Sequence, residues 1–432
     1  MQPARPHPAM SNRAAPPVRG YSPAASRTRI IVYWVLIIFI VIFPKSGVKS
    51  GVVPLTTGYA LVCLAAPLAM ADNLLRSRSS IASFMALAMC APFGGVVALS
   101  LWINGAVTPG AGLAAVASFI LLPPVFFGLF ASQLAMIPWP VIRRSIIISM
   151  RVVAVYGLFL FALKLLTGSF LEIPYLTVNA DDAGMLESTK HIDRGGIFKL
   201  ISTYNNGNLF GASMLLLLPL YIWMERSRVF IGIFIAAMIL TLSRSVWLGL
   251  LATCAMMTLQ SKVTARMLVV SACGLALFVV AIWFIAGYVG NGSNFLIDPT
   301  MGGRNSTLDQ MTQIGLMPDT PVDMLPEIVY AGVIVQYGVL GLLAFCAYLF
   351  GPIVVAKIRF PKLLPVQRYA ATGILGYAAI CLADGGIMLI PVIPIFLFVS
   401  IILLEAPRLM NAGNRIGSPM TTVPGEIFAG VK

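Results

Sequence analysis

Charged residues are scarce in this chain: Asp, Glu, Lys and Arg together make up 10% of its 432 residues. Soluble globular domains contain about 25% charged residues, so this composition excludes an ordinary water-soluble protein. Hydrophobic residues instead account for 59% of the chain, and the mean hydropathy is +0.92. The composition therefore predicts a polytopic membrane protein.

Residues that bind metals are also few. The chain has 2 histidines and 6 cysteines, and the cysteines lie far apart in sequence, without the spacing of a metal site. We interpret them as small packing residues. The sequence also lacks a glycine-rich nucleotide-binding loop and an internal repeat like those of secondary transporters. We therefore expect neither a metal nor any other cofactor.

Long apolar runs are abundant by contrast. A helix needs about 20 residues to cross a bilayer of roughly 30 Å, and stretches of this kind recur about twelve times. The predicted fold is an all-α polytopic membrane protein with about twelve transmembrane helices. The predicted spans lie near residues 30–44, 52–71, 80–102, 110–133, 145–166, 207–224, 228–243, 245–260, 267–288, 327–355, 367–384 and 387–404.

The 29 Lys and Arg residues fall mostly on one side of this arrangement. Cytoplasmic loops carry the basic excess in membrane proteins, so we place both termini in the cytoplasm. The net charge of +14 is then mostly a consequence of topology, and we expect no nucleic-acid partner. We predict a disordered cytoplasmic tail at 1–28, a transmembrane domain at 29–406 and a second cytoplasmic tail at 407–432. The basic residues on the outer side are Lys45, Lys49, Lys164, Lys190, Arg194, Lys199, Arg244 and Arg304.

Two outer loops are long, at about 167–206 and 289–326, and they hold most of the acidic residues. Most of these acids are expected on a solvated loop surface. The candidate functional residues are three arginines and one acid, in or next to these loops or within an apolar run.

Arg244 stands inside the apolar run 235–256. A charge within a membrane span costs roughly 2.5 to 3.5 kcal/mol, so it usually faces a polar cavity, a partner or a ligand. Alternatively, Ser243, Arg244 and Ser245 form a tight outer turn between two short helices. The two interpretations are compatible.

The other two arginines lie in the long loops. Arg304 follows two glycines and precedes Gly315, and its planar fork of donors suits phosphate oxygens, although most loop arginines are merely solvated. Arg194 precedes Asn206 and Asn208 at the start of a predicted span. Asn residues there suit a helix N-terminus that meets an anion, and a helix cap alone explains them equally well.

Glu327 is the candidate acid. It follows Pro326, which favours the start of a helix. A carboxylate in a first helical turn also complements the helix dipole, and that is the structural alternative to a catalytic role. Together, outward arginines, one carboxylate and no nucleotide site suggest a reaction on a phosphate-bearing lipid that needs leaving-group stabilisation and a base.

Four segments in order carry a family resemblance: STYNNGNLFGASMLLLLPL, LTLSRSVWLGLL, GGRNSTLDQ and PEIVYAGVIVQYGVLGLL. They resemble the bacterial O-antigen ligase and polymerase superfamily, from about Arg194 to Gly341. The resemblance implies a GT-C-like glycosyltransferase of the inner membrane that acts at the periplasmic face. It also implies an undecaprenyl-pyrophosphate-linked glycan as substrate, no metal, no nucleotide sugar, and inversion at the anomeric carbon.

By this resemblance, Arg244 and Arg304 bind the pyrophosphate. The spacing from Arg304 to Gly315 is similar to the R-x10-G pattern of polymerases, whereas Arg194 to Gly207 is longer by two. Ligases carry a His-Asn pair eleven and ten residues before a glycine that corresponds to Gly338, and this chain has Glu327 at the first of those positions. The expected catalytic residues are thus Glu327, Arg244 and Arg304, and the expected substrate-binding residues are Arg194, Asn206, Asn208, His191 and Tyr330.

The missing histidine favours a Wzy-type polymerase, with Glu327 as general base, over a WaaL-type ligase. A polymerase would transfer a glycan chain to the non-reducing end of another lipid-linked repeat, with a flippase and a chain-length regulator as further partners. A ligase would use lipid A core as acceptor, and a flippase or other transporter would form no glycosidic bond. Asp384 either lines the acceptor side or caps Gly385 and Gly386, and the sequence leaves both open.

Overall fold

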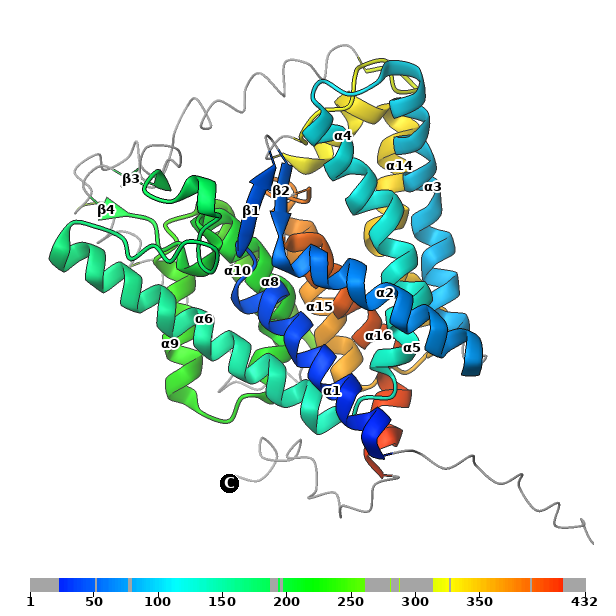
Figure 1. Ribbon diagram of the computed structural model, residues 1–432, viewed down its shortest axis with the longest axis horizontal. Helices are drawn as coiled ribbons and strands as arrows, with labels where there is room; N and C mark the ends of the chain where they lie inside the picture. Colours follow the sequence, from blue (N-terminus) through cyan, green and yellow to red (C-terminus); the bar gives the residue numbers. More distant parts are fainter. Residues whose placement is uncertain are drawn as a thin grey trace, which may run out of the picture.

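The described residues fold into a bundle of helices with two short antiparallel strand pairs (Figure 1). This computed structural model describes residues 23–50, 53–76, 80–186, 193–194, 197–260, 280, 287, 314–325, 328–388 and 391–414. The long helices are α1 (Pro23–Ile37), α2 (Thr57–Arg76), α3 (Ile81–Asn104), α6 (Trp139–Thr167), α8 (Gly207–Met224), α9 (Arg228–Ile239), α10 (Arg244–Gln260), α14 (Val329–Arg359), α15 (Pro365–Ile380) and α16 (Val392–Asn414).

Shorter elements complete the described parts. The strands are β1 (Gly47–Ser50), β2 (Val53–Thr56), β3 (Asp193–Arg194) and β4 (Ile197–Phe198). One continuous helical stretch consists of α4 (Pro109–Ala115), the π-helices η2 (Val116–Leu121) and η3 (Pro124–Phe130), and α5 (Ala131–Leu134), and the remaining short elements are η1 (Ile38–Ile42), η4 (Ala180–Asp182) and η5 (Ser202–Tyr204).

Six helices within the described residues are long and apolar enough to cross a membrane. The protein is therefore a helical, membrane-embedded protein, as its composition predicts. Helices coincide with every predicted span except the ninth, near 267–288, most of which lies outside the described residues. The six are Ile81–Asn104, Pro109–Leu134, Trp139–Thr167, Gly207–Met224, Val329–Arg359 and Val392–Met410.

The bundle has two chemically different ends. At one, which we call the basic end, α1 begins and α16 ends, and Figure 1 shows both at the bottom of the view. Arg143 Nη2 donates to the carbonyl of Met224 over 2.9 Å at this end, so the start of α6 lies beside the end of α8. At the other, the loop end, α8 and α10 begin and α15 ends.

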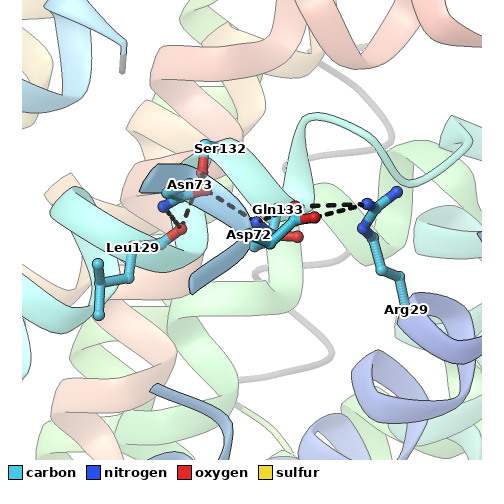
Figure 2. Close-up of polar contacts among 6 residues, drawn as sticks. All are labelled: Arg29, Asp72, Asn73, Leu129, Ser132 and Gln133. Carbon is cyan, nitrogen blue, oxygen red and sulfur yellow. Dashed lines mark hydrogen bonds and ion pairs between the residues drawn. The ribbon is translucent and has the colours of Figure 1, made fainter. Parts of the chain in front are cut away.

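A polar network fastens three helices together at the basic end (Figure 2). Arg29 on α1 and Asp72 on α2 form an ion pair of 3.2 Å. Gln133 on α5 donates to Asp72 over 2.9 Å and to Asn73 over 2.8 Å, and Ser132 donates to Asn73 over 2.6 Å. Shared hydrogen bonds of this kind satisfy polar groups near the membrane boundary and fix the helix register.

The centre of the bundle consists of α8 and α16. In their most apolar stretches, 83% and 89% of the residues are buried, compared with 33% in α3. Small residues allow close approach here, because a Cβ on Gly373 of α15 would collide with the carbonyl of Leu216 on α8. Close packing over small residues is the usual way in which helices associate in lipid.

The predicted span at 110–133 is present as the helical stretch Pro109–Leu134, but η2 and η3 within it are π-helical rather than α-helical. The N–H of Leu122 bonds to the carbonyl of Ala117, five residues back. Pro123 and Pro124 follow directly and have no N–H to donate, which breaks the α-helical hydrogen-bond pattern. The predicted span at 52–71 also begins later, because Val53–Thr56 pairs with Gly47–Ser50 as a strand.

A further difference is a sharp break within the predicted span 327–355. Gly338 has φ of 70°, so α14 consists of two helical halves joined by a kink. The apolar pattern runs through this position without interruption. The sequence therefore predicts one helix, and the kink depends on the neighbouring loop described below.

Candidate functional site

The first turn of α8 is organised by Asn206. Its backbone is extended, with φ of −156°, and its Oδ1 accepts hydrogen bonds from the N–H groups of Asn208 over 2.8 Å and of Leu209 over 3.4 Å. This is the geometry of a helix N-cap, which satisfies donors that the helix leaves unpaired. The sequence allowed a helix cap or an anion-binding helix N-terminus here, and the structure shows that Asn206 is a helix cap. Substrate binding by Asn206 stays a prediction.

Two loops meet at this cap. A Cβ on Gly207 would lie 2.9 Å from the carbonyl oxygen of Leu200 and 3.0 Å from that of Thr241, so only glycine fits without a shift. The N–H of Leu200 also donates to the carbonyl of Leu240 over 2.9 Å. The end of the first outer loop is thus fixed to the connection between α9 and α10.

Arg244 is the first residue of α10 and follows a tight turn. Leu242 has φ of 49°, and the hydroxyls of Ser243 and Ser245 lie 3.0 Å apart. The structure agrees with the turn between two short helices. Arg244 is half-buried, and its backbone lies at the positive end of the α10 dipole. A cation is unfavourable in that position unless an anion or carboxylate accompanies it.

The carboxylate of Asp384 lies between the first turns of α8 and α10. Asn208 Nδ2 donates to Asp384 Oδ2, and Ser245 Oγ donates to the same oxygen over 3.4 Å. Asp384 is 5% exposed and follows the end of α15. Its side chain therefore connects the first turns of α8 and α10 to the end of α15, and a cap of Gly385 and Gly386 stays a prediction. A role at the acceptor side stays open.

Lys199 is a buried cation that contacts Asn208, one of the two donors to this carboxylate. The residue is 6% exposed, and its Nζ lies 3.5 Å from Oδ1 of Asn208. Burial of an ammonium group is costly unless polar or charged groups surround it. Lys199, Asn208, Ser245, Arg244 and Asp384 form what we call the outer polar cluster.

The start of α14 is held beside the outer polar cluster by the end of α15. The N–H of Val329 donates to the carbonyl of Cys381 over 3.1 Å. Tyr330 OH donates to the carbonyl of Ala378 over 3.1 Å, and its ring contacts Phe345 edge-on. The Tyr330 hydroxyl thus serves helix packing, and its expected contact with substrate stays a prediction. Glu327 precedes Val329 by two residues in the sequence.

The end of the second outer loop crosses the kink of α14. The N–H groups of Val339 and Leu340 donate to the carbonyls of Gly315 and Leu316, each over 3.2 Å. A Cβ on Gly338 would lie 2.7 Å from the Leu316 oxygen. The glycine of the R-x10-G pattern is therefore a structural contact of the kink, and Arg304 lies eleven positions before it along the chain, with ten residues between them.

Several expected site residues lie outside the described residues. These are Glu327, Arg304 and His191. The backbone of Arg194 belongs to β3, which pairs with β4, and its side chain is not described. Of the expected set, the structure thus brings together Arg244, Asn206 and Asn208.

Sequence reasoning placed Lys199 on the outer side and Ser245 in the outer turn without giving either a role at the site, and it left Asp384 undecided. Asn208 and Asp384 are 176 positions apart, and no local pattern links them. One signal was available: Asp384 is an acid between two apolar spans, and such residues are functional candidates by default.

The arrangement suits an anionic ligand. Two helix N-termini and the side chains of Lys199 and Arg244 contribute positive potential, and Asp384 supplies one buried negative charge. A phosphate group that approached Arg244 would meet a planar fork of donors. No family model matches this chain, and no curated protein is similar to it in sequence.

Proposed function

We propose that this protein is a Wzy-type polymerase of lipid-linked oligosaccharide repeat units. It has about twelve spans in a GT-C-like fold, with both termini in the cytoplasm of a bacterial cell and the site at the periplasmic face of the inner membrane. The substrates are undecaprenyl-pyrophosphate-linked glycans, which serve as donor and acceptor. A flippase and a chain-length regulator are partners in this proposal.

The observation that carries the proposal is the outer polar cluster. Arg244 stands at the start of α10, Asn208 donates to the buried carboxylate of Asp384, and Lys199 contacts Asn208. This places cationic and helix-dipole potential at one end of a membrane-embedded bundle. A lipid pyrophosphate has its charged group at that depth while its polyprenyl chain remains in the bilayer.

The proposed reaction needs a base and a stabilised leaving group. Glu327 takes the proton of the acceptor sugar hydroxyl, and the hydroxyl oxygen forms a bond to the anomeric carbon of the donor glycan. The bond from that carbon to the pyrophosphate oxygen breaks, and the electron pair leaves with undecaprenyl pyrophosphate. Arg244 and Arg304 stabilise the new negative charge, and attack from the opposite side inverts the anomeric carbon.

The test is a reaction with purified full-length protein in lipid and an undecaprenyl-pyrophosphate-linked repeat unit from its own host. A polymerase gives a ladder of products on a gel. The ladder is lost in Glu327→Gln and in Arg244→Ala, provided that both variants unfold at the wild-type temperature. Arg359→Ala, an exposed arginine at the end of α14, is the matched control and keeps the ladder.

Other results exclude the proposal. New glycosidic bonds that form only after addition of lipid A core identify a ligase. No new bond with either acceptor, together with movement of the lipid-linked glycan across vesicles, identifies a transporter. A full ladder in Glu327→Gln removes Glu327 from the mechanism.

A further inference from the structure

Arginines gather at the basic end where α6 begins and where α8 connects to α9. Arg143 and Arg144 lie in the first two turns of α6, and Arg226 and Arg228 lie at the connection. The hydrogen bond from Arg143 to Met224 brings the two segments together. Arg143 is close enough to Arg226 for their like charges to repel each other. We call these four residues the arginine cluster.

The acid within this region is already engaged. Glu225 is buried, and its two carboxylate oxygens accept hydrogen bonds from Arg151 over 2.7 and 2.8 Å. Arg151 also lies over the ring of Phe230, 4.1 Å from its centre. In the described parts of the chain, no carboxylate forms an ion pair with any member of the arginine cluster. Glu225 is the one acid whose charge acts on Arg143, so positive charge exceeds negative charge in this part of the described structure.

An aromatic stack lies beside the arginine cluster. Trp139 at the start of α6 contacts Trp223 near the end of α8, with ring centres 6.2 Å apart. Trp223 stacks on Tyr369 of α15 over 5.7 Å. Trp and Tyr favour the boundary between lipid tails and headgroups. The stack therefore indicates that the arginine cluster lies at headgroup depth.

We propose that the arginine cluster binds the phosphate headgroup of an anionic phospholipid from the adjacent leaflet. Guanidinium groups pair with phosphate oxygens through two parallel hydrogen bonds, and basic groups of residues at this depth attract anionic lipids. Trp139 and Trp223 contact the glycerol and upper acyl region of the same lipid. This site lies at the opposite end of the bundle from the outer polar cluster, so it does not depend on the proposed function.

The position of the site favours a lipid over a soluble anion. Arg226 and Arg228 are exposed, and the neighbouring Val229 is 70% exposed and apolar. A membrane lipid can satisfy both surfaces at once, whereas free phosphate leaves the apolar part uncovered.

The experiment compares two charge-matched double variants of the full-length protein in nanodiscs. Arg226→Gln with Arg228→Gln removes two cations of the cluster. Arg359→Gln with Lys362→Gln removes two exposed cations from the connection between α14 and α15. The measured quantities are the unfolding temperature and the mass-spectrometric count of bound lipid, as phosphatidylglycerol or cardiolipin replaces phosphatidylcholine.

We expect anionic lipid to raise the unfolding temperature of the wild type and of the control double variant. In Arg226→Gln/Arg228→Gln, the apparent affinity should fall by about 30-fold relative to the control double variant, because two direct guanidinium contacts to the lipid phosphate are lost, at about 1 kcal/mol each. Inorganic phosphate added to phosphatidylcholine nanodiscs should raise neither the unfolding temperature nor the count of bound lipid. Equal lipid responses in the two double variants would overturn the proposal, as would a wild-type response to inorganic phosphate alone.

Discussion

Asn208, in the first turn of α8, donates a hydrogen bond to Asp384, which lies 176 positions later in the chain. Ser245, in the first turn of α10, donates to the same carboxylate oxygen. The position of Arg244, next to Ser245, therefore depends on a residue carried by the turn between α15 and α16. Asp384 is a positioning residue in this arrangement.

Two substitutions of Asp384 should show how much of its contribution to stability comes from accepting hydrogen bonds and how much from its charge. Asp384→Ala leaves the buried Ser245 and the half-buried Asn208 without this acceptor, which costs about 1–3 kcal/mol. Asp384→Asn keeps an acceptor oxygen and should cost less. Thermal unfolding in detergent measures both. Asp323→Ala is the control, because Asp323 is exposed and its side chain accepts one local N–H. Equal unfolding temperatures for Asp384→Ala and the control would contradict the assignment.

Arg244→Lys tests the planar donor fork against simple charge. The ammonium keeps the charge but loses the two parallel hydrogen bonds to phosphate oxygens. If the proposed polymerase reaction holds, we expect a loss of about 100-fold in rate or more, because one well-placed donor to a leaving group contributes about 2.7–4 kcal/mol. Initial rates of ladder formation measure this loss. Arg359→Lys should retain the wild-type rate. A wild-type rate in Arg244→Lys would exclude binding of the pyrophosphate through two parallel hydrogen bonds from Arg244.

Gly338→Ala should destabilise the protein at the kink of α14. The backbone has φ of 70° there, and the new Cβ would lie 2.7 Å from the Leu316 oxygen. The positive φ alone costs roughly 1–2 kcal/mol in a residue with a Cβ. Gly95→Ala is the matched control, since its Cβ meets nothing within 4 Å, and it should be neutral or stabilising by up to about 1 kcal/mol. The unfolding temperatures of both variants measure these effects. A Gly338→Ala protein as stable as the wild type would contradict the positive φ at this position.

Glu225 should give the protein a component of stability that acid removes. Burial acts against its charged form, but hydrogen bonds from Arg151 and from the N–H of Ser227 outweigh burial, and the pKa of Glu225 lies below its ordinary value of 4.5. A lowered pKa in the folded state means that this stabilisation is complete above pH 4.5 and is lost as the pH falls through the folded value.

Glu225→Gln provides the comparison for this pH dependence. The difference in unfolding temperature between wild type and Glu225→Gln should be constant from pH 7 down to about the ordinary carboxyl range. It should shrink at lower pH, as the carboxylate of the wild type takes up a proton. A difference that stays the same down to pH 3 would show that the ion pair with Arg151 does not supply this stability.

Local patterns predicted much of the helical layout. Apolar runs gave spans whose helices the structure contains, and Asn206 and the Ser243–Ser245 turn were interpretable from a few neighbouring residues. These features depend on backbone donors and side chains within one helical turn. They can therefore be seen in the sequence alone.

Contacts between distant segments could not be predicted in the same way. The kink at Gly338 depends on Leu316, which pairs with it from the preceding loop. The buried Lys199 contacts Asn208, on the helix that follows its loop. An uninterrupted apolar pattern carries no signal of either, because hydrophobicity in a membrane protein reports lipid exposure and burial alike.

The central position of α8 has a consequence for biogenesis. Its most apolar stretch is 83% buried, and α15 and α16, which pack against it, are synthesised much later. During translation α8 therefore faces lipid or the insertion machinery, with the first-turn Asn208 still lacking its acceptor Asp384. A chain that terminates before α15 presents this unpaired polar turn to cellular quality control. Assembly of the bundle is thus complete only when α15 and α16 pack against α8 and cover its apolar surface.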